Sequence, residues 1–368
     1  MSNTEIIAEA ELTALAARAF ENAGLSAADA AVTARHLILM DLMGVSTHGV
    51  HRIEQYVKRI QAGVVDAKAQ VATEDRAPSL AVVDGGNGQG HVAAQRAFDI
   101  ALEKAKTTGI SFVAVRRSGH FGGTASYGYL AAQAGMILMT GTGASPAMAP
   151  FGGRDLKVGN NPFGCAAPGS LADPVSGPMP FILDMAQSVA ARGKMRKLRD
   201  AGEPMPLGWA LDKITMDKAA GERIPEGWAL DADGNPTTDP AAGLDGFIQF
   251  IGGHKGYGMA LMVDILSGLL SGGEYLDQTR QMWDEDGPQG TSHFFIALDP
   301  ARLLATGEYD RRMADFRDRI KTTAPFNEGG EVLLPGEIEM RNLTDRRAKG
   351  IPVPAKTLAE VRALAEGT

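Results

Sequence analysis

The chain of 368 residues lacks several features that mark whole classes of protein. Its single cysteine, Cys165, excludes an intrachain disulfide framework and any multi-cysteine zinc site. No apolar run is long enough to cross a bilayer, and no positively charged segment precedes an apolar stretch at the start. Acidic residues outnumber basic ones by 44 to 36, and this net charge of −8 argues against a nucleic-acid-binding surface. We therefore expect a globular cytoplasmic protein with no membrane or nucleic-acid partner.

The sequence also lacks an ordinary dinucleotide-binding fingerprint. A strand expected at 79–84 leads into the glycine-rich turn 85–90 and a helix at 93–105, which is the usual context. The G-x-G-x-x-G spacing needs a glycine at position 91, where this chain has His91, and the P-loop Lys-Ser/Thr pair is missing. The segment that begins at Gly141 fails in the same way, because Pro146 replaces the third glycine. A nucleotide cofactor would have to be held differently.

The length and the hydrophobic patterning predict two packed domains. Apolar residues at helical spacing predict helices over 8–23, 26–43 and 48–62, so the first 75 residues should be mostly helical. Short apolar runs predict strands, and further helices should follow them. The expected strands are 79–84, 109–115, 136–140 and 180–186, and the further helices are 93–105, 127–135, 259–270 and 357–365, with another directly after Asp184.

The stretch 44–52 carries the clearest chemistry in the chain. Ser46, Thr47, His48 and Arg52 bring two hydroxyls, an imidazole and a guanidinium together at the end of an apolar helix. Histidine exchanges protons near neutral pH, and arginine grips a carboxylate with two parallel hydrogen bonds. The spacing of four residues places His48 and Arg52 on one face if this stretch is helical. A solvated polar helix end, or a metal held by His48 and His51, would also be compatible with this stretch alone.

Other glycine-flanked histidines lie further along the chain. His120 stands in the loop Ser118-Gly119-His120-Phe121-Gly122 between an expected strand and an expected helix. His254 precedes a strongly apolar helix, where it either hooks an anion or simply follows a glycine turn that starts the helix. We expect structural roles for His91 and His293. A short repeat, Gly-Trp-Ala-Leu-Asp, begins at Gly208 and again at Gly227, which indicates a local duplication.

Taken together, these motifs resemble those of the malate/L-lactate dehydrogenase family of the non-Rossmann type. The family includes sulfolactate and ureidoglycolate dehydrogenases, a diketogulonate reductase and reductases of cyclic ketimines such as Δ1-piperideine-2-carboxylate. The resemblance extends over nearly the whole chain in the expected order. It is carried by the segments 47–52, 109–122, 160–162, 184–194, 227–240, 252–256 and 334–337.

The resemblance implies an α+β fold, with a mixed β-sheet domain and a separate helical domain, in a homodimer. We expect residues 1–75, joined by helices of 256–330, to form the helical domain. Residues 76–255, with 331–368, should form the cofactor-binding sheet domain. The implied reaction is NAD- or NADP-dependent hydride transfer at the carbon beside a substrate carboxylate, without a metal.

Site residues follow from the resemblance position by position. His48 would donate and accept the proton, beside Thr47 and Ser46, and His120 could share this role. Arg52 would bind the substrate carboxylate, with Asn160 and Ser188 also touching the substrate. The cofactor would be held by His120, Phe121, Gly122, Gly123, Thr124, Ser145, Pro180, Phe181, Ile182, Asp184, Pro335, Gly336 and Glu337.

Two departures from the family pattern affect these assignments. The family commonly has serine before the catalytic histidine, whereas this chain has Thr47. The second Gly-Trp-Ala-Leu-Asp copy lengthens a segment that is normally single, so residues 196–226 align poorly.

At the position where we expect ketimine reductases to carry an acid, this chain has Lys194, and a cation there favours an anionic 2-oxo acid over a cationic iminium. A ketimine reductase and a non-catalytic binding protein on the same scaffold are the alternatives.

Overall fold

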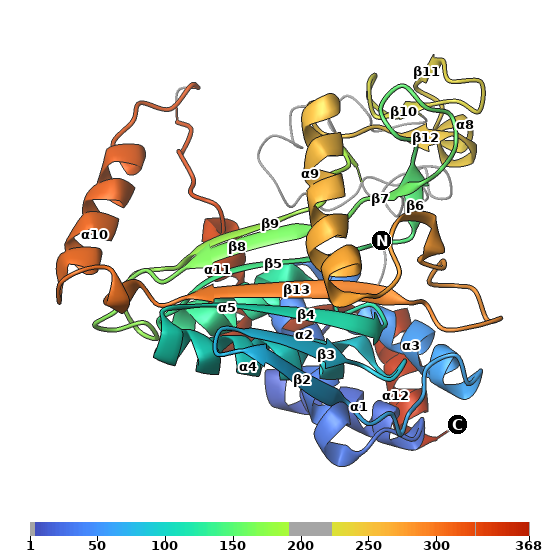
Figure 1. Cartoon of the computed structure of the whole chain (residues 1–368), viewed down its shortest axis with the longest axis horizontal. Coiled ribbons are helices and arrows are strands. Elements are labelled where there is room, and N and C mark those ends of the chain that lie inside the picture. The colour runs from blue at the N-terminus through green and yellow to red at the C-terminus, as the bar shows by residue number, and fades with distance from the viewer. Residues whose placement is uncertain (1–3, 191–222, 328, 368) are drawn as a thin grey trace.

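A seven-stranded sheet forms the centre of the computed structural model, which describes residues 4–190, 223–327 and 329–367 (Figure 1). Its strand order is β2-β3-β4-β13-β5-β8-β9, in which β3 and β4 run parallel and the other neighbours antiparallel. This is a mixed sheet, as predicted. Its strands are β2 (Ala72–Ala77), β3 (Leu80–Asp84), β4 (Ile110–Ser118), β5 (Ile137–Thr142), β8 (Phe163–Ala167), β9 (Phe181–Met185) and β13 (Thr291–Leu298).

Helices cover both faces of the sheet (Figure 1). Helix α4 (Gly90–Thr108) crosses from β3 to the parallel strand β4, and α5 (Thr124–Gln133) lies beside it against β5 and β8. Alanines form much of the buried side of α4, so its backbone approaches the sheet closely. On the opposite face, α9 (His254–Asp264) continues into a π-helical turn, η3 (Ile265–Leu269), which packs on β13 and β4.

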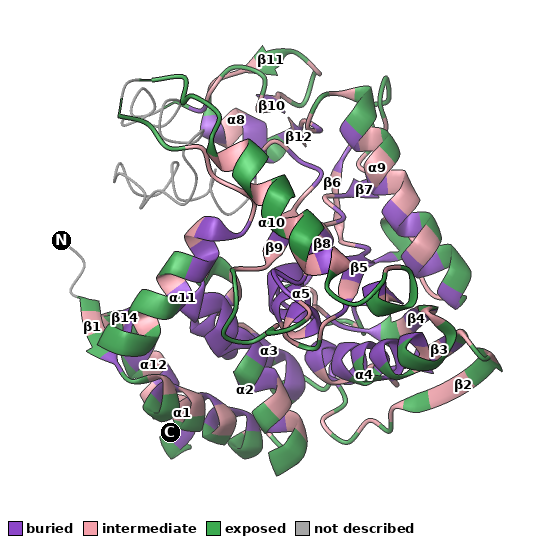
Figure 2. Cartoon of the chain, turned by 90° about the vertical axis from the view of Figure 1, so that its left-hand side faces the viewer, coloured by how far each residue is buried: buried purple, intermediate pink, exposed green. Residues whose placement is uncertain are grey.

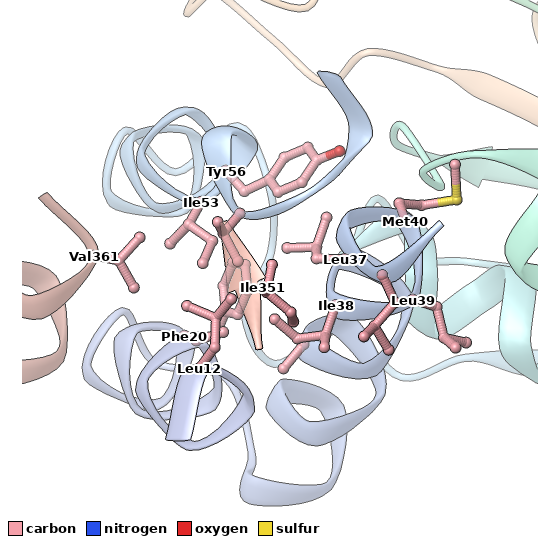
Figure 3. Packing of buried hydrophobic residues seen from close by; sticks show 14 of the residues in the cluster. Leu12, Phe20, Leu37, Ile38, Leu39, Met40, Ile53, Tyr56, Ile351 and Val361 are labelled. Carbon is pink, nitrogen blue, oxygen red and sulfur yellow. The ribbon is translucent and has the colours of Figure 1, made fainter. Parts of the chain in front are cut away.

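A helical assembly stands beside the sheet, and its core is mostly aliphatic, with the aromatic rings of Phe20 and Tyr56 among the aliphatic side chains (Figure 3). Helices α1 (Glu9–Asn22), α2 (Ala27–Leu42) and α3 (Ile53–Gln61) agree with the helices predicted from hydrophobic spacing. Ser26 begins α2 as predicted, since its hydroxyl accepts the N–H of Asp29 at 3.2 Å. The C-terminal helices α11 (Glu337–Lys349) and α12 (Ala355–Glu366) join them.

The C-terminal segment therefore differs from the domain division expected from the sequence. Strand β14 (Ile351–Pro354) pairs with β1 (Thr4–Ile7), and α12 packs against α1, so 351–366 accompany the helical assembly and not the sheet. Conversely, β13 lies between β4 and β5 in the centre of the sheet, although 256–330 were expected in the helical domain. The reason is burial, because Phe294, Phe295 and Ala297 are fully enclosed and need cover on both faces.

Smaller elements complete the described part of the chain. A further cluster of buried residues lies where α8 (Pro240–Asp245), α9 and four short strands meet. The four strands are β6 (Pro146–Met148), β7 (Val158–Gly159), β10 (Ala229–Leu230) and β12 (Phe247–Ile248). Strand β11 (Pro236–Thr237) pairs with β10. Helix α10 (Glu308–Lys321) is largely exposed, whereas α4 and α5 are mostly buried (Figure 2).

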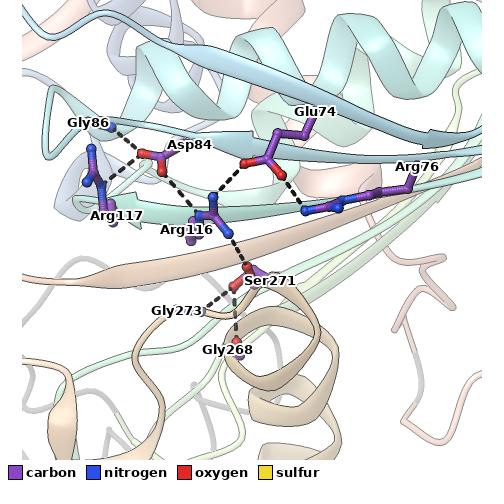
Figure 4. A network of polar contacts seen from close by, with 9 residues as sticks. All are labelled: Glu74, Arg76, Asp84, Gly86, Arg116, Arg117, Gly268, Ser271 and Gly273. Carbon is purple, nitrogen blue, oxygen red and sulfur yellow. Dashed lines mark hydrogen bonds and ion pairs between the residues drawn. The ribbon is translucent and has the colours of Figure 1, made fainter.

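An ion-pair network fixes the end of β4, from which the His120 loop begins (Figure 4). Arg116 donates to Glu74 on β2 at 2.6 Å and to Asp84 on β3 at 3.1 Å, and it reaches the carbonyl of Ser271 beyond η3. The glycine-rich turn 85–90 packs against the same loop. A Cβ at Gly90 would lie 2.3 Å from the carbonyl oxygens of Gly119 and His120, so this glycine serves close backbone packing.

The helix predicted directly after Asp184 is wrong for the residues that are described. Residues 186–190 are irregular, and Ser188 forms an isolated β-bridge with Phe250. Arg192, Lys194 and the first copy of the repeat, 208–212, lie outside the described residues.

Candidate active site

The loop after α2 carries His48 and Arg52, but not on one continuous helix as predicted. Two short 3₁₀ turns, η1 (Ser46–His48) and η2 (Val50–Arg52), are separated by Gly49, whose backbone is extended with ψ −152°. Arg52 then stands at the N-cap of α3. Glycine is required at this break, since a Cβ at Gly49 would lie 2.0 Å from the carboxylate of Asp41.

Asp41 is a buried acid that holds this loop from below. Its side chain is in the last turn of α2, and its Oδ2 accepts the N–H of Val50 at 2.7 Å. Burial raises the pKa of Asp41 from 3.8 to about 7, while the Val50 hydrogen bond and the charge of Arg346 oppose that rise. Asp41 therefore fixes the backbone between His48 and Arg52.

His48 is half-buried between the exposed Thr47 and the His120 loop. Its Nδ1 lies 3.1 Å from the hydroxyl of Thr47, and its ring stacks on that of His120 with centroids 5.5 Å apart. Burial, together with the nearby charge of Arg52, lowers the pKa of His48 to about 4. The imidazole is thus neutral at pH 7 and able to accept a proton. Ser46 is exposed beside it.

Arg52 turns back toward the histidine although it is on the next helix. Its Nε donates to the carbonyl oxygen of Thr47 at 2.8 Å, and its Nη1 donates to Gln55 at 2.9 Å. Within the described ranges, no side chain accepts a hydrogen bond from its Nη2. The guanidinium is therefore held beside His48 with N–H groups left for a ligand carboxylate, although the two residues are not on one continuous helix.

The loop that carries His120 is anchored on both sides. The backbone N–H of His120 donates to Gln289 at 3.1 Å, and its Nδ1 lies 2.7 Å from the hydroxyl of Tyr56 on α3. Phe121, expected against the cofactor, is fully buried and stacks on His293 with centroids 4.5 Å apart. Its side chain belongs to the core because the apolar ring has no exposed surface, so only its backbone can face a ligand.

The start of α5 joins this loop to the end of β9. Asp184 accepts the N–H of Ala125 at 2.9 Å, and a Cβ at Gly123 would lie 3.3 Å from the same carboxylate. Gly122 has a φ of +87°, which a glycine adopts without strain. The four predicted residues Gly122, Gly123, Thr124 and Asp184 are thus in one place, next to Met40 of α2.

The two other predicted cofactor segments lie side by side. The N–H of Ile182 donates to the carbonyl of Pro335 at 3.0 Å, and Gly336 packs so closely on Ile182 that a Cβ there would clash. Pro180 and Phe181 precede this contact, and Phe181 is the first residue of β9. Glu337 is committed internally, since its carboxylate accepts from Lys321 at 2.9 Å and from the N–H of Leu334 at 2.8 Å. A direct contact from Glu337 to a cofactor would therefore require exchanging these bonds.

Asn160 and Ser188 are on neighbouring segments, as expected for two substrate contacts. The N–H of Gln187 donates to the carbonyl of Asn160 at 2.8 Å. The hydroxyl of Ser188 and both amide atoms of Gln187 are buried and have no hydrogen-bond partner among the residues that the structure describes. Ser145 belongs to this side of the fold as well, because Asn161, next to Asn160, accepts the N–H of Ala144 at 2.9 Å. The hydroxyl of Ser145 donates to the carbonyl of Arg280.

These residues fit a nicotinamide dinucleotide and a small acid. Unpaired buried polar atoms are costly unless a ligand or water satisfies them, and within the described ranges Ser188, a predicted substrate contact, and its neighbour Gln187 supply such atoms. Thr124 is the first residue of α5, and the N-terminus of this helix is already satisfied by the protein, since Asp184 accepts the N–H of Ala125 at 2.9 Å. Within the described ranges, no three His, Cys, Asp or Glu residues cluster so as to hold a metal ion.

Sequence reasoning missed three residues around the histidines and one beside Asn160. Asp41, Tyr56, Gln187 and Gln289 carry no motif of their own and reach the site only through the fold. The sequence did offer one indication that Tyr56 lies near Arg52, because it follows Arg52 by four residues on an amphipathic helix.

His91 and His293 have the structural positions that were expected, since both are buried and hydrogen-bonded to neighbouring side chains. None of the helices that the structure describes is long and apolar enough to span a membrane.

Comparison with known proteins agrees with the arrangement of these motifs. A family model described as malate/L-lactate dehydrogenase matches residues 7–217 and 211–362. Malate dehydrogenase of Pyrococcus abyssi is 34% identical over 355 residues, which cover 96% of this chain and 92% of that protein. Delta(1)-pyrroline-2-carboxylate reductase of Ancylobacter novellus is 33% identical over 343 residues, covering 93% and 92%. The structure of sulfolactate dehydrogenase from Methanocaldococcus jannaschii superimposes with a TM-score of 0.84 at 33% identity, covering 98% of this chain and 97% of that one.

Proposed function

Because this chain belongs to the malate/L-lactate dehydrogenase family, we propose that it is an NAD- or NADP-dependent dehydrogenase of 2-hydroxy acids. The substrate would be a malate-, lactate- or sulfolactate-like carboxylate, interconverted with its 2-oxo acid. The observation that carries this proposal is the cluster of His48, His120 and Arg52. It places an acid/base beside a fixed cation at the surface of the helical assembly.

His48 performs the proton transfer in this proposal. Oxidation of a 2-hydroxy acid releases the hydroxyl proton, and a neutral imidazole with a lowered pKa accepts it. In the reverse direction the imidazole must be protonated. A substrate carboxylate bound to Arg52 offsets the positive charge that otherwise disfavours the imidazolium, so substrate binding itself favours the protonated acid.

Arg52 orients the substrate in this proposal, and Asn160 and Ser188, whose hydroxyl is buried, contact the rest of it. The dinucleotide, when bound, accepts or donates the hydride at C2. Residues 120–124, Pro180, Phe181, Ile182 and Asp184, the backbone of Pro335 and Gly336, and Ser145 are the residues proposed to hold it. Backbone N–H groups of loops can hold phosphates without a glycine fingerprint, and this is the role proposed for these loop segments.

The location and assembly of the protein are also part of this proposal. The family resemblance supports a cytoplasmic homodimer with no membrane or nucleic-acid partner. Light scattering after gel filtration would check the dimer. The preference between NAD and NADP would follow from titrating each reduced cofactor.

A second candidate function is reduction of a cyclic ketimine carboxylate. The relative named pyrroline-2-carboxylate reductase, almost as similar in sequence as the malate dehydrogenase, favours keeping this candidate. His48 and Arg52 serve both reactions equally, because both substrates carry a carboxylate and both need a proton. The cationic Lys194 of the sequence favours the oxo acid.

The test is a comparison of kcat/KM with one reduced cofactor at saturation. Oxaloacetate, pyruvate and sulfopyruvate are compared with Δ1-piperideine-2-carboxylate and Δ1-pyrroline-2-carboxylate. We expect the best oxo acid to exceed both imines by at least tenfold. An imine preferred by tenfold would replace the first candidate by the second, and no absorbance change with any substrate would indicate a binding protein.

A further inference from the structure

His120 has an unusual set of partners at one ring nitrogen. Its Nδ1 lies 2.7 Å from the hydroxyl of Tyr56 and 3.2 Å from the backbone nitrogen of Gly122. A backbone N–H can only donate, so Nδ1 of His120 must accept this bond and carries no proton. The Tyr56 hydroxyl then completes the arrangement by donating to the same nitrogen.

The ionisation of both residues agrees with this polarity. Burial, followed by the charges of His48 and Arg52, lowers the pKa of His120 well below its usual value, so the ring is neutral. A neutral imidazole with a bare Nδ1 holds its one proton on Nε2. Burial raises the pKa of Tyr56 above its usual value, so the phenol keeps its proton and remains a donor.

Tyr56 is held firmly in the position that makes this bond. It is 3% exposed, and its ring packs between Phe20, at 6.4 Å, and His91, at 5.5 Å. Figure 3 shows its hydroxyl directed away from the aliphatic cluster of the helical assembly. The phenol thus joins this rigid core to the His120 loop.

We propose that Tyr56 is a positioning residue that fixes His120 as the Nε2–H tautomer, a hydrogen-bond donor, and so leaves proton transfer to His48. His120 cannot accept a proton at Nε2, which already has one. Accepting at Nδ1 would break the bonds to Tyr56 and Gly122 together. This inference rests on the proposed dehydrogenase function for its catalytic meaning, but the tautomer itself does not.

His48 differs from His120 in the feature that matters. Its Nδ1 faces the hydroxyl of Thr47, at 3.1 Å, and a hydroxyl can donate or accept. Both tautomers and the protonated ring are therefore compatible with the surroundings of His48. Two stacked histidines thus have separate tasks, since one exchanges the proton and the other offers a constant N–H.

The first experiment is nitrogen NMR of protein labelled with ¹⁵N only in histidine, with the signal of His120 assigned from its loss in His120→Gln. We expect a protonated Nε2 and a bare Nδ1 in the wild type from pH 5 to 9. In Tyr56→Phe only the longer bond from the N–H of Gly122, at 3.2 Å, still favours a bare Nδ1, so the tautomer with its proton on Nδ1 should become detectable. Tyr309→Phe is the matched control. Tyr309, on α10, is also a buried phenol, and its hydroxyl donates to the carbonyl oxygen of Pro168 at 2.8 Å. Its His120 signals should remain those of the wild type. A proton on Nδ1 in the wild type, or unchanged tautomers in Tyr56→Phe, would overturn the proposal.

The second experiment exploits amide isosteres, which settle the question even if Tyr56→Phe fails to fold. A glutamine amide can place an N–H near the position of Nε2, whereas an asparagine amide is nearer to Nδ1. We expect His120→Gln to keep about a tenth of kcat with KM little changed, and His120→Asn to lose about tenfold more. His48→Gln should lose about 10²–10⁴-fold, because an amide cannot transfer the proton. Equal losses in His120→Gln and His48→Gln would show that His120 also exchanges protons. If the wild type turned over no substrate, the proposed function would fail while the NMR result still decided the tautomer.

Discussion

The buried acid under the catalytic loop offers a sharp test of the site. Asp41→Asn keeps the size of the side chain and an oxygen that can accept the N–H of Val50. In the wild type the nitrogen of Val50 lies 2.7 Å from Asp41 Oδ2. It removes only the possibility of a negative charge at a position that is 4% exposed. The substitution therefore isolates the free energy of keeping a carboxylate ionised inside the protein.

The size of the effect follows from the pKa of Asp41, which rises from 3.8 to about 7 on folding. Below pH 4 the group is protonated in both the folded and the unfolded chain, so it adds no pH dependence. Between pH 4 and pH 7 the unfolded chain ionises while the folded one keeps its proton, and wild-type stability declines. An interval of about 3 pH units at 1.36 kcal/mol each corresponds to a loss of up to about 4 kcal/mol above pH 7.

The assay is urea unfolding of the wild type and Asp41→Asn at pH 4, 5.5, 7 and 8.5. We expect equal stability at pH 4 and a growing advantage of the variant up to pH 7, with a plateau above. Asp66→Asn is the matched control, because exposed Asp66 also accepts one backbone N–H, from Lys68 at 2.8 Å, but its carboxylate stays hydrated. An advantage of Asp41→Asn that is constant with pH, or absent, would refute the reasoning.

Three further predictions concern the chemistry directly. His48→Ala should lower kcat by about 10²–10⁴-fold while the dissociation constant of the reduced cofactor, measured by fluorescence, stays within about twofold; near-normal turnover would assign the proton to another group. Arg52→Lys should raise KM for a 2-oxo acid more than tenfold in steady-state assays, because lysine cannot reproduce the guanidinium fork, and an unchanged KM would place the carboxylate elsewhere. Since the pKa of free His48 is lowered to about 4, kcat/KM for oxidation should be flat from pH 6 to 9, whereas kcat/KM for reduction should fall as pH rises; a break near pH 6.5 in the oxidation profile would contradict the burial of His48.

Local sequence patterns predicted the elements that depend on local physics. The spacing of Leu12, Leu15 and Phe20 predicted α1, and Ser26 with Asp29 predicted the start of α2. The apolar runs that form β3, β4, β5 and β9 were predicted for the same reason, because each buries its own side chains. The helix expected after Asp184 shows the limit. There the chain around Ser188 is held by pairing with Phe250, sixty-two residues later, which no local pattern reveals.

Long-range pairing explains what remained unpredicted in the fold. Strand β13 inserts between β4 and β5, and β14 returns to β1, so the sheet and the helical assembly each contain segments that are far apart in the sequence. The site had the same limit. His48, Arg52 and His120 were predicted from their residue types, whereas Tyr56 and Asp41 act through hydrogen bonds to other segments. The sequence could not show which side of the His120 loop faces the core, so it did not reveal that the side chain of Phe121 is buried there.

Helix α11 explains how a late segment can belong to the same site as His48. Its first turn begins at Gly336, packed on Ile182 in the proposed cofactor-binding strand. Further along, Asn342 donates to the carbonyl of Met43 at 3.2 Å, and Arg346 donates to that of Asp41, at the end of α2 from which the His48 loop departs. Gly44 is required at this contact, because its φ is +87° and a Cβ would lie 2.5 Å from Asn342. A helix of 13 residues, about 20 Å long, is stiff. It therefore fixes the distance between the proposed cofactor segment and the acid/base loop. This distance matters because one bound substrate must reach the hydride donor and the acid/base at the same time.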